Sequence, residues 1–154
     1  MRRIILLLAS GGYAGYIPVA SGTFGTLVAI PLFWVFEPMR HVSVPLYLLT
    51  WVAAVGVACW IADRAEALLE EHDSGVIVID EVVGYLAATL FLPPTWEITL
   101  LAFFVFRALD VIKPFPAGWI DREMPGGLGV VLDDVVSGLY SNVVTRVLAA
   151  LLFT

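Results

Sequence analysis

Two pairs of carboxylates interrupt stretches of sequence that are otherwise apolar enough to lie in a membrane. Asp80 and Glu81 lie in the run 75–92, and Asp133 and Asp134 lie in a second run near the C-terminus. An ionised side chain in hydrocarbon costs at least ~2.5–3.5 kcal/mol on insertion scales, so these groups need water, a cation or one another. The chain must therefore fold so that its acids face a shared polar site.

The composition is typical of an integral membrane protein. Of the 154 residues, 60% are apolar and 14% are charged, whereas soluble domains carry roughly 25% charged residues. Because no second composition block appears, residues 1–154 are interpreted as a single membrane domain. Hydrophobic windows predict an all-α helical bundle with about five membrane helices, the first of them short or re-entrant. The predicted helices are 21–36, 45–61 with a polar extension to 71, 76–92, 96–112, and 129 to the C-terminus.

The connections between these helices are of two kinds. Residues 1–20, 62–75 and 113–128 are long and polar, and most of the arginines and lysines lie in or near them. If every segment spans, these connections share one side of the membrane, and their basic residues predict that this side is cytoplasmic. The apolar run 1–9 is too short for a signal peptide and is interpreted as part of the mature chain.

A glycine follows each acidic pair by about one helical turn. Gly84 lies four residues after Asp80, and Gly138 lies four residues after Asp134, so each glycine shares a helix face with a carboxylate. Small residues let two membrane helices approach closely. Two such faces in contact would gather the carboxylates in one pocket. Oxygen ligands without histidine or thiolate favour Mg²⁺ as the bound ion.

Basic residues accompany the acids in the segment Phe106-Arg-Ala-Leu-Asp-Val-Ile-Lys-Pro114. Arg107, Asp110 and Lys113 recur at i, i+3 and i+6, roughly on one side of a helix end. Arg107 offers a fork that suits phosphate oxygens, and Lys113 offers a point charge. Snorkelling at the membrane interface is an alternative that explains Lys113 better than Arg107. A second alternative is that these bases only form ion pairs with the acids. Because the acids outnumber the bases, pairing alone would leave some carboxylates without a partner.

The loop Ala20-Ser-Gly-Thr-Phe-Gly-Thr26 precedes an apolar helix. Ser21 or Thr23 can cap that helix, and free backbone N–H groups at a helix start attract anions. We therefore count Ser21, Thr23 and Thr26 among candidate phosphate-binding residues. A plain helix cap explains the same residues equally well.

Several functional classes lack the residues they require. With only His41 and His72 on the chain, a lipid phosphatase that uses paired histidines is excluded. Only four residues separate Cys59 from Arg64, whereas cysteine phosphatases need five residues between the cysteine and the arginine. No basic run supports binding to nucleic acid. His72-Asp73 could bind a metal and Asp121 could reach the site, although a solvated position explains each of them at least as well.

Four motifs occur together and in order along nearly the whole chain. They are Gly22-Thr-Phe-Gly-Thr26, Ile79-Asp-Glu-Val-Val-Gly84, Phe106-Arg-x-x-Asp-x-x-Lys-Pro-x-Pro116 and Gly126-Gly-x-Gly-x-x-x-Asp-Asp-x-x-x-Gly138. In this order and spacing they resemble the phosphatidylglycerophosphatase A family. The resemblance implies a Mg²⁺-dependent lipid phosphatase of the bacterial inner membrane. Such an enzyme removes the terminal phosphate of phosphatidylglycerophosphate on the cytoplasmic side.

The resemblance also implies roles for particular residues. The family's motif residues fall on Thr23, Asp80, Glu81, Arg107, Asp110, Lys113, Asp133 and Asp134. Asp80, Glu81, Asp133 and Asp134 are the expected metal ligands, and these four with Asp110 are the expected catalytic residues. Ser21, Thr23, Thr26, Arg107 and Lys113 are expected to bind the substrate. The expected partner is a phospholipid in the bilayer, and no feature indicates an oligomer.

Other functions fit parts of the same pattern. Pocket shape would decide whether another lipid phosphate or an isoprenoid phosphate is the substrate. A small cation or proton transporter also carries intramembrane acids, but these would be distributed across the bilayer. A purely structural bundle with buried ion pairs would not need an excess of acids. The gathering of acids and bases near one end favours hydrolysis.

Overall fold

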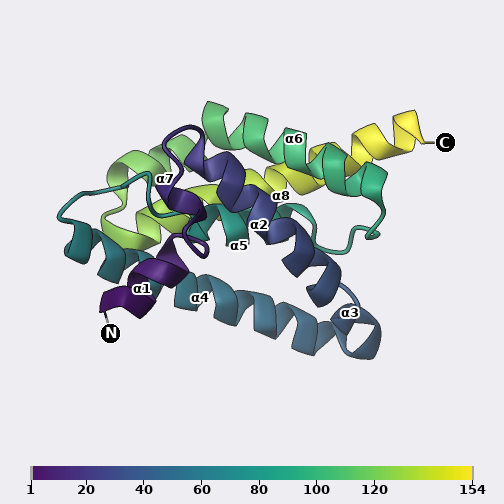
Figure 1. The fold of residues 1–154 in the computed structure, drawn as a ribbon. Helices are drawn as coiled ribbons and strands as arrows, with labels where there is room; N and C mark the ends of the chain where they lie inside the picture. The colour runs from purple at the N-terminus through teal and green to yellow at the C-terminus, as the bar shows by residue number, and fades with distance from the viewer. Residues whose placement is uncertain (1, 154) are drawn as a thin grey trace.

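The computed structural model describes residues 2–153, which form a helical bundle without strands (Figure 1). The predicted all-α fold is therefore confirmed for this part of the chain. Its elements are the helices α1 (Arg2–Ala9), α2 (Ser21–Phe36), α3 (Met39–Val42), α4 (Val44–Leu69), α5 (Ile79–Ala88), α6 (Trp96–Ile112), α7 (Ala117–Glu123) and α8 (Gly126–Leu152), with the short 3₁₀ turn η1 (Ala14–Tyr16).

Local sequence signals set the helix boundaries. Ser43 precedes α4, and its hydroxyl accepts a hydrogen bond from the backbone N–H of Leu46. Thr95 does the same for Ile98 at the start of α6. These side chains satisfy N–H groups that have no partner within the helix. The predicted bounds of α2 and α6 agree with the structure, and those of α4 and α8 agree to within a few residues.

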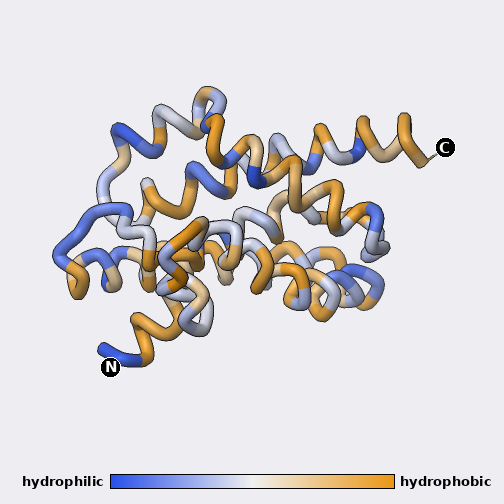
Figure 2. The backbone as a smooth tube through the Cα atoms, turned by 45° about the horizontal axis from the view of Figure 1, so that its top comes forward, coloured by the Kyte–Doolittle hydropathy of each residue, from blue (hydrophilic) through white to orange (hydrophobic). Residues whose placement is uncertain are grey.

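The outer surface of the bundle suits a membrane. Three segments among the described residues are long and apolar enough to cross a bilayer, and they cover Ser21–Val42, Val44–Leu69 and Gly126–Leu152. Large apolar side chains such as Leu49 and Phe104 are exposed on the surface, and hydrophobic positions recur along the long helices in Figure 2. Lipid chains would cover this apolar surface at no cost, so the chain is a membrane protein. The number of complete spans stays a prediction.

The predicted helix 76–92 is much shorter in the structure. α5 has only ten residues and is about 15 Å long, half the thickness of the hydrocarbon core. Most of its residues are buried, and it contacts α2, α4, α6 and α8. The first helix, α2, has its predicted bounds, and the candidate span that begins with it continues through α3 to Val42. Whether this first segment is re-entrant stays a prediction.

The chain can leave the helix after α5 because other side chains bind its freed backbone carbonyls. Asn142 of α8 donates from Nδ2 to the carbonyl oxygens of Ala88 and Leu90, each at 2.9 Å. Arg146 donates to Leu90 at 2.8 Å, and Arg40 donates to Phe91 at 3.1 Å. Irregular backbone at membrane depth is tolerated where protein groups satisfy it. Sequence periodicity carries no sign of these distant donors.

Glycines allow α5 and α8 to approach closely, as their positions predicted. A Cβ atom added to Gly84 would lie 2.9 Å from the backbone oxygen of Asp134. One added to Gly138 would overlap the carbonyl oxygen of Gly84. Contact of this kind between backbones needs residues without a side chain. The α5–α8 contact is the most extensive between any two elements of the described chain.

The long polar connections gather at one end of the bundle. Figure 1 shows α1, α7 and the segment 70–78 at the end away from the C-terminus. The backbone N–H of Val78 donates to Ala9 at 2.8 Å, which joins the segment 70–78 to α1. Gly127 of α8 lies against the backbone of Cys59 and Asp63 in α4. This arrangement brings the acidic ends of α5 and α8 to the same place.

We expect Gly138→Ala to lower the midpoint of thermal unfolding in detergent, because the added methyl group forces α5 and α8 apart. The cost should be about 1–3 kcal/mol, as for overpacking elsewhere. Gly56→Ala in α4 is the matched control, since a Cβ there meets nothing within 4 Å. It should leave the midpoint unchanged or raise it slightly. Equal midpoints for the two variants would contradict a close contact between α5 and α8.

Candidate active site

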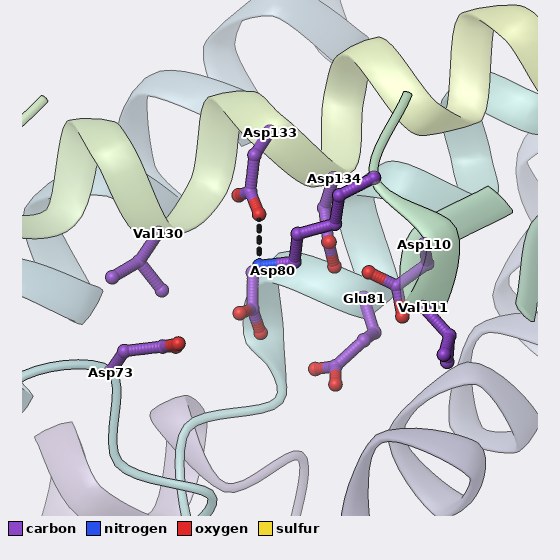
Figure 3. Close-up of a pocket in the computed structure, with 9 residues that line it drawn as sticks. Asp73, Asp80, Glu81, Asp110, Val111, Val130, Asp133 and Asp134 are labelled. Atoms are coloured by element: carbon purple, nitrogen blue, oxygen red, sulfur yellow. Dashed lines mark ion pairs between the residues drawn. The ribbon is translucent and has the colours of Figure 1, made fainter. Parts of the chain in front are cut away.

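An acidic cavity of about 220 Å³ opens between α5, α6, α8 and the segment 70–78 (Figure 3). All five of the expected catalytic and metal-binding residues line this cavity. The complete lining is Asp73, Asp80, Glu81, Asp110, Val111, Lys113, Val130, Asp133 and Asp134. Residues from four separate parts of the chain thus share one polar space.

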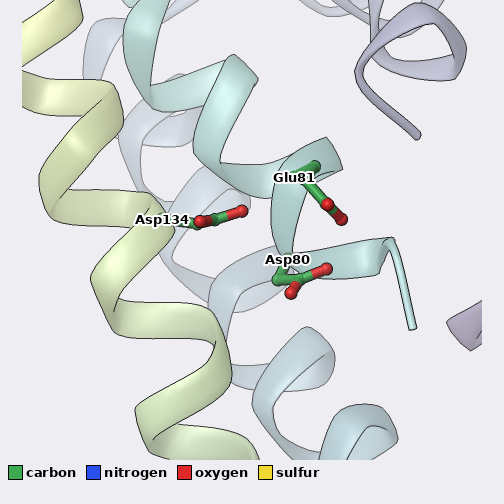
Figure 4. A group of neighbouring side chains, drawn as sticks. All are labelled: Asp80, Glu81 and Asp134. Carbon is green, nitrogen blue, oxygen red and sulfur yellow. The ribbon is translucent and has the colours of Figure 1, made fainter. Parts of the chain in front are cut away.

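Two helices provide the central carboxylates. Asp80 and Glu81 lie in the first turn of α5, where the positive end of the helix dipole favours negative charge. Asp134 lies on the face of α8 that touches α5, and the side chains of all three residues converge in Figure 4. One carboxylate oxygen from each lies within 4.8 Å of the others. This spacing is compatible with three ligands of a single cation.

The same carboxylates carry oxygens that no protein group satisfies. Asp80, Asp133 and Asp134 are 7%, 2% and 3% exposed. Each has one buried oxygen without a hydrogen-bond partner among the described residues, and so does Glu81. Unpaired buried charges are very costly unless a counter-ion is present. The donor set consists only of oxygens, so it fits a hard divalent cation such as Mg²⁺.

Arg107 turns into the protein and binds the acids. Its Nη1 lies 2.6 Å from Asp110 Oδ2 and 3.8 Å from Glu81 Oε1. The same nitrogen donates to Thr26 Oγ1 of α2 at 3.5 Å. A Cβ on Gly22 would overlap Glu81 and crowd the guanidinium, so this glycine makes room for both. The Arg107 side chain therefore points into the bundle, whereas a snorkelling side chain would point toward the membrane surface.

Lys113 joins α6, α7 and α8 at the edge of the cavity. It ends α6 in a left-handed conformation, and Pro114 follows. Its Nζ lies 2.6 Å from Asp121 Oδ1 and 2.7 Å from Asp133 Oδ2. Partial burial disfavours the charged ammonium, but hydrogen bonds to the two carboxylates outweigh it and raise the pKa of Lys113. Asp133 lies outside the group of three convergent carboxylates, and its role as a metal ligand stays a prediction.

The hydroxyl residues near the start of α2 differ in position. Thr26 is buried, donates to the Gly22 carbonyl at 2.8 Å and contacts Arg107. Ser21 lines a neighbouring cavity of about 340 Å³ instead, and Thr23 is half-buried and lines neither cavity. The predicted cap is wrong, because the residue that precedes α2 is Ala20 and no side chain caps the helix. Ser21 and Thr23 already lie within the first turn.

Sequence reasoning undervalued two acidic residues. Asp73 is exposed in the turn after α4, as a solvated position predicts, and it also lines the cavity. Asp121 binds Lys113. Asp73 is only seven residues from Asp80 in the sequence, which is the one indication that it could reach the cavity. Spacing alone does not show that the intervening turn brings Asp73 back toward Asp80.

The family assignment follows from comparison with known proteins. Residues 7–149 match the family model described as phosphatidylglycerophosphatase A. The chain belongs to the phosphatidylglycerophosphatase A family. The family resemblance noted from the four motifs is thereby confirmed. No solved structure matches the chain.

Three bacterial relatives span most of the chain. Phosphatidylglycerophosphatase A of Escherichia coli is 36% identical over 136 residues, which are 88% of this chain and 77% of the relative. The protein of the same name from Haemophilus influenzae is 33% identical and covers 91% of this chain and 85% of its own. A Bacteroides thetaiotaomicron protein, provisionally named a phosphatidylinositol-3-phosphatase, is 32% identical over 152 residues. The matched region is 92% of this chain and 91% of the relative.

We expect Lys113→Met to destabilise the protein, because it leaves Asp133 buried without its counter-ion. The loss should be about 3 kcal/mol, as when one partner of a buried pair is removed. It should appear as a lower midpoint of thermal unfolding in detergent. The double variant Lys113→Met/Asp133→Asn should recover most of the loss. If the loss of stability in the double variant equals the sum of the losses in the two single variants, direct coupling between the two residues is contradicted.

Proposed function

We propose that this chain hydrolyses the terminal phosphate of phosphatidylglycerophosphate and releases phosphatidylglycerol. The observation that carries the proposal is the buried convergence of Asp80, Glu81 and Asp134 beside Arg107 and Lys113, in a chain of the phosphatidylglycerophosphatase A family. The lipid's acyl chains would stay in the bilayer while its head group enters the cavity. We further propose that the protein spans the bacterial inner membrane several times, with this cavity at the cytoplasmic end.

Asp80, Glu81 and Asp134 would hold Mg²⁺, with Asp133 as a further predicted ligand. When bound, the ion would offset the acids' charge, polarise a P–O bond and lower the pKa of a bound water. The unpaired oxygens of the four carboxylates support this assignment. Their number suits a cation that keeps part of its water shell.

The chain's own residues account for the remaining chemistry. Arg107 and Lys113 would donate to the phosphate oxygens and stabilise the charge that develops there. A carboxylate of the cavity would accept a proton from the attacking water. The water oxygen then forms a bond to phosphorus, the bond from phosphorus to the terminal glycerol oxygen breaks, and that oxygen takes up a proton. Phosphatidylglycerol and inorganic phosphate leave.

A second candidate substrate is another lipid phosphomonoester. The Bacteroides relative, provisionally named for phosphatidylinositol 3-phosphate, favours this alternative. The same cavity chemistry would serve either lipid, because only the phosphate and its ester bond react. The two candidates therefore differ in head-group recognition and not in mechanism.

Phosphate release by the purified protein in detergent distinguishes the candidates. We expect release from phosphatidylglycerophosphate with Mg²⁺, loss of release with a chelator, and recovery when Mg²⁺ is restored. Phosphatidic acid and phosphatidylinositol 3-phosphate should be much poorer substrates. Preference for either of these two lipids would replace the proposed substrate, and full activity with a chelator would contradict the metal assignment.

Replacing Asp80 or Asp134 by Asn should reduce phosphate release at least about 100-fold, because each change removes a charged ligand of the proposed cation. The variants should still insert into membranes, since the apolar segments are unchanged. Glu97→Gln is the control, because Glu97 is an exposed carboxylate outside the cavity. Full activity in either aspartate variant would end this ligand assignment.

Arg107→Lys should lower kcat/KM about 100-fold, because lysine keeps the charge but loses the fork that binds two phosphate oxygens. The measurement is steady-state hydrolysis of phosphatidylglycerophosphate. Arg64→Lys provides the matched control on an exposed part of α4. A similar small effect in both variants would mean that Arg107 does not contact the phosphate.

A further inference from the structure

The turn after α4 brings an additional carboxylate to the acidic cavity. Asp73 lies in the segment 70–78 and lines the cavity together with Asp80 and Asp133. Figure 3 shows the Asp73 side chain pointing toward Asp80, while Asp110 lies on the far side of the view. Because Arg107 binds Asp110, Asp73 stands at the end of the cavity away from Arg107.

Glu66 of α4 holds this turn in place. Its Oε1 accepts a hydrogen bond from the backbone N–H of Asp73 at 2.8 Å and another from His72 Nδ1 at 2.5 Å. An ionised carboxylate only accepts, so Nδ1 of His72 is assigned as the donor in this pair. The Glu66 side chain is only 11% exposed. It is anchored in α4, so it fixes the turn relative to the rest of the bundle.

The backbone at Asp73 needs such support. Asp73 has a φ of 48°, in the left-handed region that residues other than glycine rarely adopt. Aspartate tolerates this region better than most residues do. The hydrogen bond from its N–H to Glu66 favours the conformation that directs the side chain toward the cavity.

Other acids of the same segment do not share this position. Glu70 ends α4 and is exposed, and Glu71 lines the neighbouring cavity beside Ser21. The oxygens left unpaired in the acidic cavity include one from Asp80 and one from Asp133. Asp73 therefore lines the cavity from its exposed side, outside the group of three convergent carboxylates.

We propose that Asp73 contributes its carboxylate to divalent-cation binding in the acidic cavity and that Glu66 is the residue that positions it. The proposal rests on the metal-dependent part of the proposed function and adds a ligand at the cavity mouth. Mg²⁺ and Mn²⁺ both accept a set of carboxylate oxygens and waters. Glu66 touches neither cation nor substrate and acts through the turn.

Mn²⁺ binding to the purified full-length protein tests this without turnover, with free Mn²⁺ measured by electron paramagnetic resonance. Asp73→Asn and Glu66→Ala should each raise the Kd at least about 10-fold, as loss of supporting groups does at other metal sites. Glu66→Gln keeps an acceptor oxygen for the Asp73 N–H and should recover most of the affinity. Glu70→Gln is the matched control and should change the Kd less than about 2-fold.

The outcomes separate this proposal from the one on which it rests. An unchanged Kd in Asp73→Asn, with binding lost in Asp80→Asn, would overturn the role of Asp73 and leave the phosphatase proposal intact. Equal weakening by Glu66→Gln and Glu66→Ala would overturn the positioning role of Glu66. Absence of Mn²⁺ binding by the unmodified chain would overturn both proposals about the cation. Asp73→Asn alters an exposed side chain and decides the question even if Glu66→Ala fails to fold.

Discussion

Contact between the backbones of α5 and α8 is the constraint on which the acidic site depends. Gly84 and Gly138 permit it, because any side chain at either position would meet the opposite backbone. The contact places Asp134 beside the first turn of α5, where Asp80 and Glu81 begin the helix. Without this approach, carboxylates on two helices would be separated by ordinary side chains and could not share a cation.

Charges around the cavity are divided between two tasks. Arg107 binds Asp110, and Lys113 binds Asp121 and Asp133, so the bases are held by acids at the edge. The convergent carboxylates at the centre keep unpaired oxygens. Under the proposed function, a cation would occupy the centre and the two bases at the edge would donate to the phosphate oxygens. Such an arrangement costs stability, which is characteristic of functional sites.

Polar residues at the opposite end of the bundle have a different task. Arg40 pairs with Glu37 and binds the carbonyl of Phe91, while Asn142 and Arg146 bind carbonyls at the end of α5 and just after it. These groups satisfy backbone that has left the helix, and they line no part of the acidic cavity. The acidic cavity differs from this second group because several carboxylates with unpaired oxygens converge there.

The sequence by itself determined the helical class, the bounds of α2 and α6, and the end of the bundle at which the acids gather. Hydropathy acts over a few neighbouring positions, so it can be read directly from the chain. The glycine spacing also indicated that α5 and α8 touch. The four motifs indicated the family, because their order and spacing are specific even though each is weak alone.

Only the tertiary structure decided the length of α5, the partners of Lys113 and the place of Asp73. α5 ends early because side chains from α3 and α8, more than 50 residues away in sequence, bind the carbonyls it frees. Asp73 reaches the cavity because Glu66 folds the intervening turn. Interactions between distant segments leave no periodic signal in the sequence, and their geometry exists only once the helices have packed.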